Sequence, residues 1–157
     1  MATIYCIDTS SLIAAWQERY PPEHFPAFWG KMNVLIDQGQ LVAIREVLEE
    51  MTKRSDELHK WLKQRGEMFR DLEAPIQLEA ARILGRFPRL VGERKLRTSA
   101  DPFVIALAKV EGMTVVTEEK PTGSLQSNPK IPDVCGAIGV PWIGLLDLIK
   151  AEKWVIG

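Results

Sequence analysis

Short apolar runs alternate along this chain with longer segments in which apolar residues recur at helical spacing. Residues 3–7, 40–44, 113–117 and 141–144 form the short runs, and the first of them is rich in β-branched and aromatic side chains, which is typical of a buried strand. Strands that alternate with helices form a parallel or mostly parallel sheet with helices on both of its faces. The pattern therefore predicts an α/β fold with a central, mostly parallel sheet.

The helical segments can be placed from their apolar spacing and from the residues that end them. Gly112 ends an apolar helix over residues 100–110. A helical pattern also starts at Arg45 and continues as far as Phe69, with Ser55 as the N-cap of a new helix within it. We expect further helices over residues 12–16, 25–36, 76–84, 131–138 and 145–153, a basic loop over residues 85–98 and a polar loop over residues 120–130.

The chain has 157 residues, which is the size of one domain, and we expect residues 1–157 to form a single domain. Its two cysteines, Cys6 and Cys135, lie among apolar residues without the spacing of a metal or redox motif. They indicate buried free thiols in a reducing compartment. The sequence has no signal-peptide pattern and no apolar stretch of about 20 residues, so we expect a cytoplasmic protein that does not enter a membrane.

The balance of charge gives no sign of a strongly basic surface. The formal net charge is -1, which argues against a nucleic-acid binder that works through a global positive field. Lysine and arginine are nevertheless clustered in two parts of the sequence, and these clusters either line one groove or form only the solvated faces of helices. The first cluster is Lys53, Arg54, Lys60, Lys63, Arg65 and Arg70, and the second is Arg82, Arg86, Arg89, Arg94, Lys95 and Arg97.

Four acidic residues stand at the ends of predicted strands or in the helices that follow them. Asp8 follows the first strand and Glu119 the third, while Asp101 lies in the first turn of a helix and Glu50 in the helix after the second strand. Ligand-binding groups gather at the carboxyl ends of parallel strands, and carboxylates that share a site repel one another unless a cation neutralises them. The four acids together predict a site for Mg²⁺ or Mn²⁺, which prefer hard oxygen ligands.

Each of these acids also has an ordinary structural explanation. Asp8 is a good helix N-cap, Asp101 is a favoured first-turn acid, and Glu50 is a common helix former. Other chemistries find less support, because the sequence has no GxSxG elbow and no phosphate-binding glycine loop, and His24 and His59 lack metal-ligand spacing. Metal-assisted hydrolysis of a phosphodiester, which needs no Ser, His or Cys nucleophile, is the reaction that fits the acids.

The sequence resembles the PIN-domain family across nearly its full length. Four segments resemble the family's signature blocks in order: Cys6-Ile7-Asp8-Thr9-Ser10, the helical segment 47–51, Ser99-Ala100-Asp101-Pro102-Phe103 with its continuation to residue 108, and Val115-Val116-Thr117-Glu118-Glu119. Residues 130–135 and the following Gly139-Val140 resemble an uncharacterised bacterial and archaeal PIN subfamily. The resemblance implies a three-layer α/β/α fold and an Mg²⁺- or Mn²⁺-dependent ribonuclease, often the toxin of a VapC-like toxin–antitoxin pair.

The resemblance places the family's acids, as catalytic residues and metal ligands, on Asp8, Glu50, Asp101 and Glu119. One departure appears at the fourth position, where many members have a Thr-x-Asp block and this chain has Thr117-Glu118-Glu119. Glu118 is therefore an alternative ligand at this position. Glu46 is the reserve candidate for the helix glutamate, and Asp133 is a candidate for a further carboxylate.

These observations lead to the interpretation of the chain as a metal-dependent endoribonuclease and the toxin of a type II toxin–antitoxin pair. We expect an RNA substrate, a cognate antitoxin and a homodimer. Basic side chains would hold RNA phosphates, and Trp16 or Trp61 either stacks on a base or belongs to the core. The alternative is a non-catalytic PIN module that binds RNA or a protein partner, and cation binding separates the two because a scaffold need not retain four acids.

Overall fold

The computed structural model describes residues 2–52, 56–90 and 99–156. Its centre is a five-stranded sheet in the order β3-β2-β1-β4-β5, and every pair of neighbouring strands is parallel. The strands are β1 (Tyr5–Ile7), β2 (Leu41–Ile44), β3 (Phe69–Arg70), β4 (Thr114–Val116) and β5 (Trp142–Ile143). The predicted parallel sheet is confirmed.

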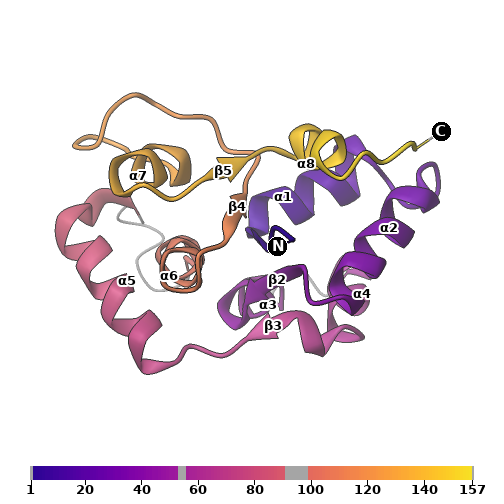
Figure 1. Cartoon of the computed structure of the whole chain (residues 1–157), viewed down its shortest axis with the longest axis horizontal. Coiled ribbons are helices and arrows are strands. Elements are labelled where there is room, and N and C mark those ends of the chain that lie inside the picture. The colour runs from indigo at the N-terminus through magenta and orange to yellow at the C-terminus, as the bar shows by residue number, and fades with distance from the viewer. Residues whose placement is uncertain (1, 53–55, 91–98, 157) are drawn as a thin grey trace.

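Helices cover both faces of this sheet. They are α1 (Thr9–Ala14), α2 (Pro26–Asp37), α3 (Arg45–Met51), α4 (Glu57–Lys63), α5 (Ala74–Arg86), α6 (Asp101–Glu111), α7 (Ile131–Ile138) and α8 (Leu145–Ala151). A π-helical turn, η1 (Ala15–Arg19), continues α1, and two short 3-10 turns are η2 (Gly66–Met68) and η3 (Pro88–Leu90). Figure 1 shows α5, α6 and α7 on one side of the sheet and α1, α2 and α8 on the other. The fold is therefore α/β with three layers.

The main difference from the predicted elements lies between Arg45 and Phe69. The sequence predicted helical structure throughout. The structure instead has two short helices, α3 and α4, and then the unpredicted strand β3, which begins at Phe69 and pairs with β2. A strand of two residues is too short to show the alternation that distinguishes a strand from a helix, so only its pairing defines it. Ser55 lies outside the described residues, and α4 is capped by Asp56, whose side chain accepts a hydrogen bond from the backbone N of His59.

The core is built from the inner strands and from α6. All residues of β1 and β2 are buried, because helices cover the sheet from both sides. Helix α6 packs on β1, β2 and β4 and also on α5, and its residues 104–108 are all buried. Cys6 and Cys135 are free and buried, as predicted. Within the described ranges, no helix combines the length and the apolar character that crossing a bilayer requires.

Three tryptophans form a cluster beside this core. The ring centroid of Trp16 lies 4.9 Å from that of Trp29 and 6.3 Å from that of Trp61. The guanidinium of Arg65 lies 3.9 Å from the centroid of Trp61, a distance at which a cation is attracted to the ring face. Trp16 and Trp61 are partly buried and pack against the core, which supports the structural alternative for these two residues.

Gly112 and Gly136 provide a matched test of two helices. Gly112 is the left-handed C-cap of α6, with φ of 70°, whereas Gly136 lies within α7, and an added Cβ has open space at both positions. We expect Gly112→Ala to lower the free energy of unfolding by about 1 kcal/mol, because an L-residue is strained in this conformation. Gly136→Ala should raise it by about 0.5–1 kcal/mol. Urea unfolding measures both changes, and a loss of stability at Gly136 would contradict the helical assignment of α7.

Candidate functional site

The order of the strands creates a natural binding position between β1 and β4. The chain crosses from β1 to β2 in one direction, and β4 and β5 lie on the other side of β1, so the direction of winding changes between β1 and β4. In open parallel sheets, ligands bind in the crevice outside the carboxyl ends of the two strands at such a point. Asp8 directly follows β1, and residues 117–119 directly follow β4. We call this region the carboxylate edge.

Asp8 is the most deeply buried acid of the carboxylate edge, with only 1% of its surface exposed. It is the N-cap of α1, and its Oδ1 accepts a hydrogen bond of 2.8 Å from the backbone N of Ser11. Its Oδ2 accepts hydrogen bonds from the hydroxyl of Ser10 at 2.8 Å and from that of Thr117 at 2.6 Å. The helix-cap explanation for Asp8 is therefore correct, and the same geometry fixes the position of its carboxylate.

The environment of Asp8 favours a nearby cation. Burial raises the pKa of Asp8 to about 6, although the hydrogen bonds from Thr117, Ser11 and Ser10 act to lower it. These donors are all neutral, so none of them supplies the positive charge that a buried carboxylate needs. A hard divalent cation at the carboxylate edge would supply that charge, and oxygen is its preferred ligand atom. The Asp8 carboxylate thus has the chemistry of a ligand for Mg²⁺ or Mn²⁺.

Thr117 connects Asp8 to Glu119. The hydroxyl of Thr117 donates to Asp8 and accepts a hydrogen bond of 3.1 Å from the backbone N of Glu119. The Glu119 Oε1 accepts a hydrogen bond of 3.0 Å from the backbone N of Ile131, the first residue of α7. Burial raises the pKa of the Cys135 thiol to about 12, with further contributions from the charges of Asp8 and Glu119. Asp8 and Glu119 therefore both lie near this thiol.

Glu118 points away from this pair. Its Oε2 accepts a hydrogen bond of 2.9 Å from the backbone N of Leu145, and its Oε1 lies 3.4 Å from the Arg19 guanidinium. A Cβ at Gly144 would lie 2.9 Å from Glu118 Oε2, so the glycine leaves room for this carboxylate. Successive side chains of an extended segment point in opposite directions. The placement therefore favours Glu119 over Glu118 as the acid that serves the carboxylate edge.

The two glutamates proposed for the helix after β2 have different surroundings. The Glu50 Oε1 accepts a hydrogen bond of 2.5 Å from the hydroxyl of Thr9, the residue that follows Asp8. Glu46 has its Oε1 buried without a hydrogen-bond partner in the described part of the chain. Burial raises the pKa of Glu46, and the nearby charges that act on it are those of Glu49, Arg45 and Asp71. Glu50 is therefore the one that contacts the segment following β1.

Asp101 is the first residue of α6. This helix leads into β4 and packs on β1, β2 and β4, so its N-terminus lies toward the carboxyl ends of the strands. The backbone N of Asp101 donates a hydrogen bond of 3.3 Å to the hydroxyl of Ser99, which is also buried. A role for the Asp101 carboxylate at the carboxylate edge stays a prediction.

Asp133 has a different function in the structure, because its carboxylate holds the loop over residues 120–130. It accepts hydrogen bonds from the backbone N of Lys130, the backbone N and hydroxyl of Thr122, and the backbone N of Gly123. Burial acts to raise the pKa of Asp133, but these hydrogen bonds outweigh it and lower the pKa below its usual value. Both oxygens of Asp133 are thus occupied within the loop and the start of α7.

The carboxylates do not form a closed metal cage in this conformation. Within residues 2–52, 56–90 and 99–156, no group of three or more His, Cys, Asp or Glu side chains is close enough to hold an ion. Glu119 is directed at the start of α7 and Glu50 at Thr9. A cation held by three of these carboxylates therefore requires them to lie closer together than they do here.

The structure also shows supporting residues that the sequence interpretation missed. Thr9 and Thr117 orient two of the predicted acids through their hydroxyls, and Arg19 pairs with Glu118. In the sequence, only its place next to Asp8 marked Thr9, and only its place two residues before Glu119 marked Thr117. Of the two basic clusters, Lys53, Arg54, Arg94, Lys95 and Arg97 lie outside the described residues.

Comparisons with known proteins concern both the sequence and the fold. A family model described as "Domain of unknown function (DUF4411)" matches residues 5–156. No curated protein sequence matches the chain.

Three solved structures cover most of the chain. VapBC2 from Rickettsia felis, bound to a DNA fragment from its promoter, is 13% identical, with a TM-score of 0.53 over 90% of this chain and 98% of the other. FitAcB from Neisseria gonorrhoeae is 14% identical, with a TM-score of 0.53 over 89% and 96%. FitAB bound to an IR36 DNA fragment is 17% identical, with a TM-score of 0.53 over 90% and 94%. At these identities the likeness is one of fold, and it confirms the PIN-like α/β/α architecture.

Proposed function

We propose that this chain, which belongs to the DUF4411 family of domains of unknown function, is a metal-dependent endoribonuclease. The observation that supports this most strongly is the buried carboxylate of Asp8, held by three neutral donors where the winding of the sheet changes direction. Asp8 needs a positive charge, and the other predicted acids lie on the segments around it. The PIN-like fold of the structural relatives supports the same proposal.

The proposed residues have different roles at the carboxylate edge. Asp8, Asp101 and Glu119 would hold Mg²⁺ or Mn²⁺, and Glu50 would either complete the ligand set or take a proton from the attacking water. When bound, the cation would activate a water molecule for attack on phosphorus and neutralise charge on the phosphate. Thr117 and Ser10 keep the Asp8 carboxylate oriented through their hydroxyls. This orientation lowers the cost of assembling the site, because Asp8 is already in place.

Glu50 and Glu119 are suited to change partners when the site assembles. The Glu50 carboxylate accepts a hydrogen bond from the hydroxyl of Thr9, the residue after Asp8. The Glu119 carboxylate accepts one from the backbone N of Ile131, and Glu119 lies two residues after Thr117. If either glutamate turns away, its present hydrogen-bond donor loses its partner, which costs roughly 1–3 kcal/mol for a buried group. Coordination of a divalent cation offsets such a cost, since it removes the repulsion among the acids.

We further propose that the protein is the toxin of a type II toxin–antitoxin pair, works as a homodimer and is neutralised by an antitoxin. The Rickettsia felis relative is VapBC2 bound to promoter DNA, and the FitAB relative is also bound to DNA. By this analogy, the partner would be a small DNA-binding protein. Expression of the chain alone should arrest growth, and co-expression of the protein encoded next to it should restore growth. Growth arrest by the Asp8→Asn variant as well would count against an enzymatic toxin.

The substrate class can be tested with purified protein. We expect the wild type to cut a labelled single-stranded RNA in Mn²⁺ and to leave it intact in EDTA. A DNA oligonucleotide of the same sequence should be cut far more slowly. Equal cleavage of both would point to a general nuclease, and cleavage that persists in EDTA would exclude the metal-dependent mechanism.

A further inference from the structure

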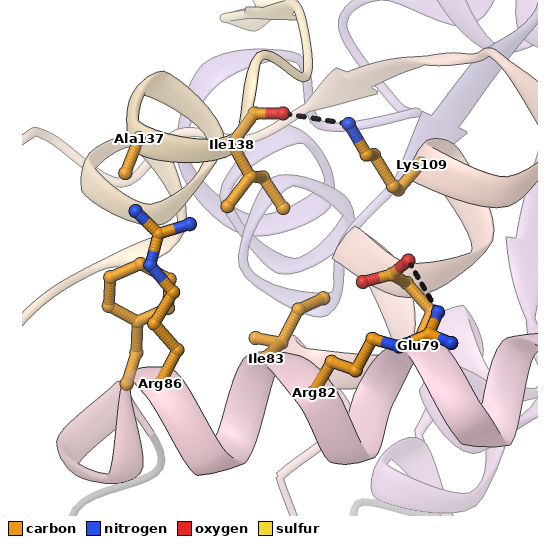
Figure 2. Close-up of a pocket in the computed structure, with 8 residues that line it drawn as sticks. Glu79, Arg82, Ile83, Arg86, Lys109, Ala137 and Ile138 are labelled. Carbon is orange, nitrogen blue, oxygen red and sulfur yellow. Dashed lines mark hydrogen bonds and ion pairs between the residues drawn. The ribbon is translucent and has the colours of Figure 1, made fainter.

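A second concave site lies away from the carboxylate edge, between helices α5, α6 and α7. It is a hollow of about 460 Å³, which is within the range of pockets that hold small ligands. Figure 2 shows Ile83 of α5 and Ile138 of α7 pointing toward one another across it. Ile83 and the neighbouring Phe87 are buried and give the hollow an apolar floor. We call this site the α5–α7 groove.

The rim of the α5–α7 groove is positively charged. Arg82, Arg86 and Lys109 line it, and Glu79 is the one acid among the described residues of its wall. Arg82 and Arg86 are four residues apart on α5, so they lie on one face of the helix. Glu79 pairs with Arg82 at 3.5 Å, while the Arg82 side chain remains 73% exposed. Three cations against one acid leave these lining residues with an excess of positive charge.

Two of the three cations, Lys109 and Arg86, have contacts with residues of the groove. The Lys109 Nζ donates a hydrogen bond of 2.9 Å to the backbone O of Ile138. The guanidinium of Arg86 lies 5.0 Å from the centroid of the Phe87 ring, and Figure 2 shows it extended toward Ala137 of α7. An apolar floor with cations at its rim matches a ligand that is flat and apolar at one end and anionic at the other.

The groove is connected to the carboxylate edge by two of its own helices. Asp101 begins α6 and Lys109 lies near its end, eight residues further on, which is about 12 Å along the helix axis. The first residue of α7, Ile131, donates its backbone N–H to Glu119, and the last residue, Ile138, lines the groove. A single-stranded chain of a few nucleotides can span such a distance. The groove is thus placed to hold a part of the substrate that is not cut.

We propose that the α5–α7 groove binds a nucleotide of single-stranded RNA, and this inference rests on the proposed function in taking RNA as the substrate. The phosphate lies against Arg82, Arg86 and Lys109, and the base lies on the apolar floor made by Ile83 and Phe87. Phosphate contacts by basic side chains set the position of a nucleic acid, and unstacked bases of single-stranded RNA are available for such packing. The groove fixes where the strand passes over the carboxylate edge.

RNA binding without cleavage tests this assignment. Fluorescence anisotropy of a labelled single-stranded RNA is measured in EDTA at several salt concentrations, with the wild type and with the double variant Arg82→Gln/Arg86→Gln. The matched control is Lys150→Gln/Lys153→Gln, which removes the same charge from α8 and the turn that follows it, outside both basic clusters, and thermal melting checks that each variant is folded. We expect the groove variant to bind RNA about tenfold more weakly and to reduce the slope of log K against log salt by about 1.4, since each contact contributes about 0.7.

The outcomes separate the groove from the catalytic proposal. Equal affinity of the groove variant and the control would overturn the inference, as would binding of an acidic peptide by a wild type that does not bind RNA. If the wild type binds RNA through the groove and never cuts it in Mn²⁺, the inference stands and the proposed catalysis fails. If the wild type cuts RNA and the groove variant has an unchanged KM, the catalysis stands and the groove inference fails.

Discussion

The Asp8→Asn variant is expected to lose metal-dependent RNA cleavage and to be more stable than the wild type when no metal is bound. The substitution removes the charge that a cation requires and keeps the size of the side chain. Changing a residue that only supports a metal ligand costs about 10–100-fold in affinity or activity. Removal of a ligand's charge should therefore reduce cleavage by at least about a hundredfold.

The gain in stability follows from the raised pKa of Asp8. Burial moves this pKa to about 6 from a usual value of 3.8, so between these values the folded protein binds a proton that the unfolded chain has released. The free energy of unfolding of the metal-free wild type therefore falls as the pH rises through this window and stays low above it. A difference of about two in pKa corresponds to about 3 kcal/mol. The asparagine of the Asp8→Asn variant stays neutral. This variant should therefore unfold at a higher urea concentration than the wild type at pH 7, and at nearly the same concentration below about pH 4.

The control for this comparison is Asp147→Asn, which changes an exposed acid in the first turn of α8. It should cleave RNA at the wild-type rate and show no gain in stability at pH 7. If Asp8→Asn cleaves RNA as fast as this control, Asp8 has no part in the mechanism. If Asp8→Asn is less stable than the wild type at pH 7, the charge of Asp8 does not destabilise the metal-free protein.

The second large effect is a contrast between two adjacent residues. Glu119→Gln should weaken Mn²⁺ binding and RNA cleavage by at least about tenfold, while Glu118→Gln should change both by less than about twofold. Both variants keep an oxygen that accepts the existing backbone hydrogen bond, from Ile131 in one case and Leu145 in the other. Glu118→Gln also loses its ion pair with Arg19, whose side chain is 55% exposed. Such pairs contribute about 0–1 kcal/mol, so its stability should change little.

Calorimetry with Mn²⁺ and a cleavage assay measure this contrast directly. The pair is matched in charge change, in side-chain volume and in position along the chain, so a general loss of charge cannot produce a difference between the two. A larger loss in Glu118→Gln would move the fourth carboxylate by one residue. It would also mean that the glutamate directed at α8 turns toward the carboxylate edge when metal binds.

The sheet and most helices could be predicted from the sequence because their signals are local. The apolar run before Asp8 and the glycine that ends α6 each act within a few residues, and the structure places both elements where they were expected. Strand β3 was missed because Phe69–Arg70 carries no periodic signal of its own. It exists as a strand through its pairing with Ala43 and Ile44, contributed by a distant segment.

The sequence predicted candidate residues for the site, but it could not predict their contacts. Placing Asp8 and Glu119 after neighbouring strands required only the expectation of a parallel sheet. The hydrogen bond from Thr117 to Asp8 joins residues 109 positions apart, and the contact of Glu119 with the start of α7 depends on the path of the loop between them. Sequence patterns do not specify such distances. The different partners of Glu118 and Glu119, at Leu145 and Ile131, likewise depend on segments far along the chain, and the choice of Glu119 as ligand stays a prediction.

Central to the proposed mechanism is a catalytic cation site that Asp8, Asp101 and Glu119 form together. The most direct test is titration of metal-free wild-type protein with Mn²⁺ by calorimetry, with Asp8→Asn measured under the same conditions. We predict saturable binding to the wild type, at Mn²⁺ concentrations that also restore RNA cleavage, and no such binding to the variant. Equal Mn²⁺ binding by the two proteins, or no binding by the wild type at concentrations that support cleavage, would contradict the mechanism.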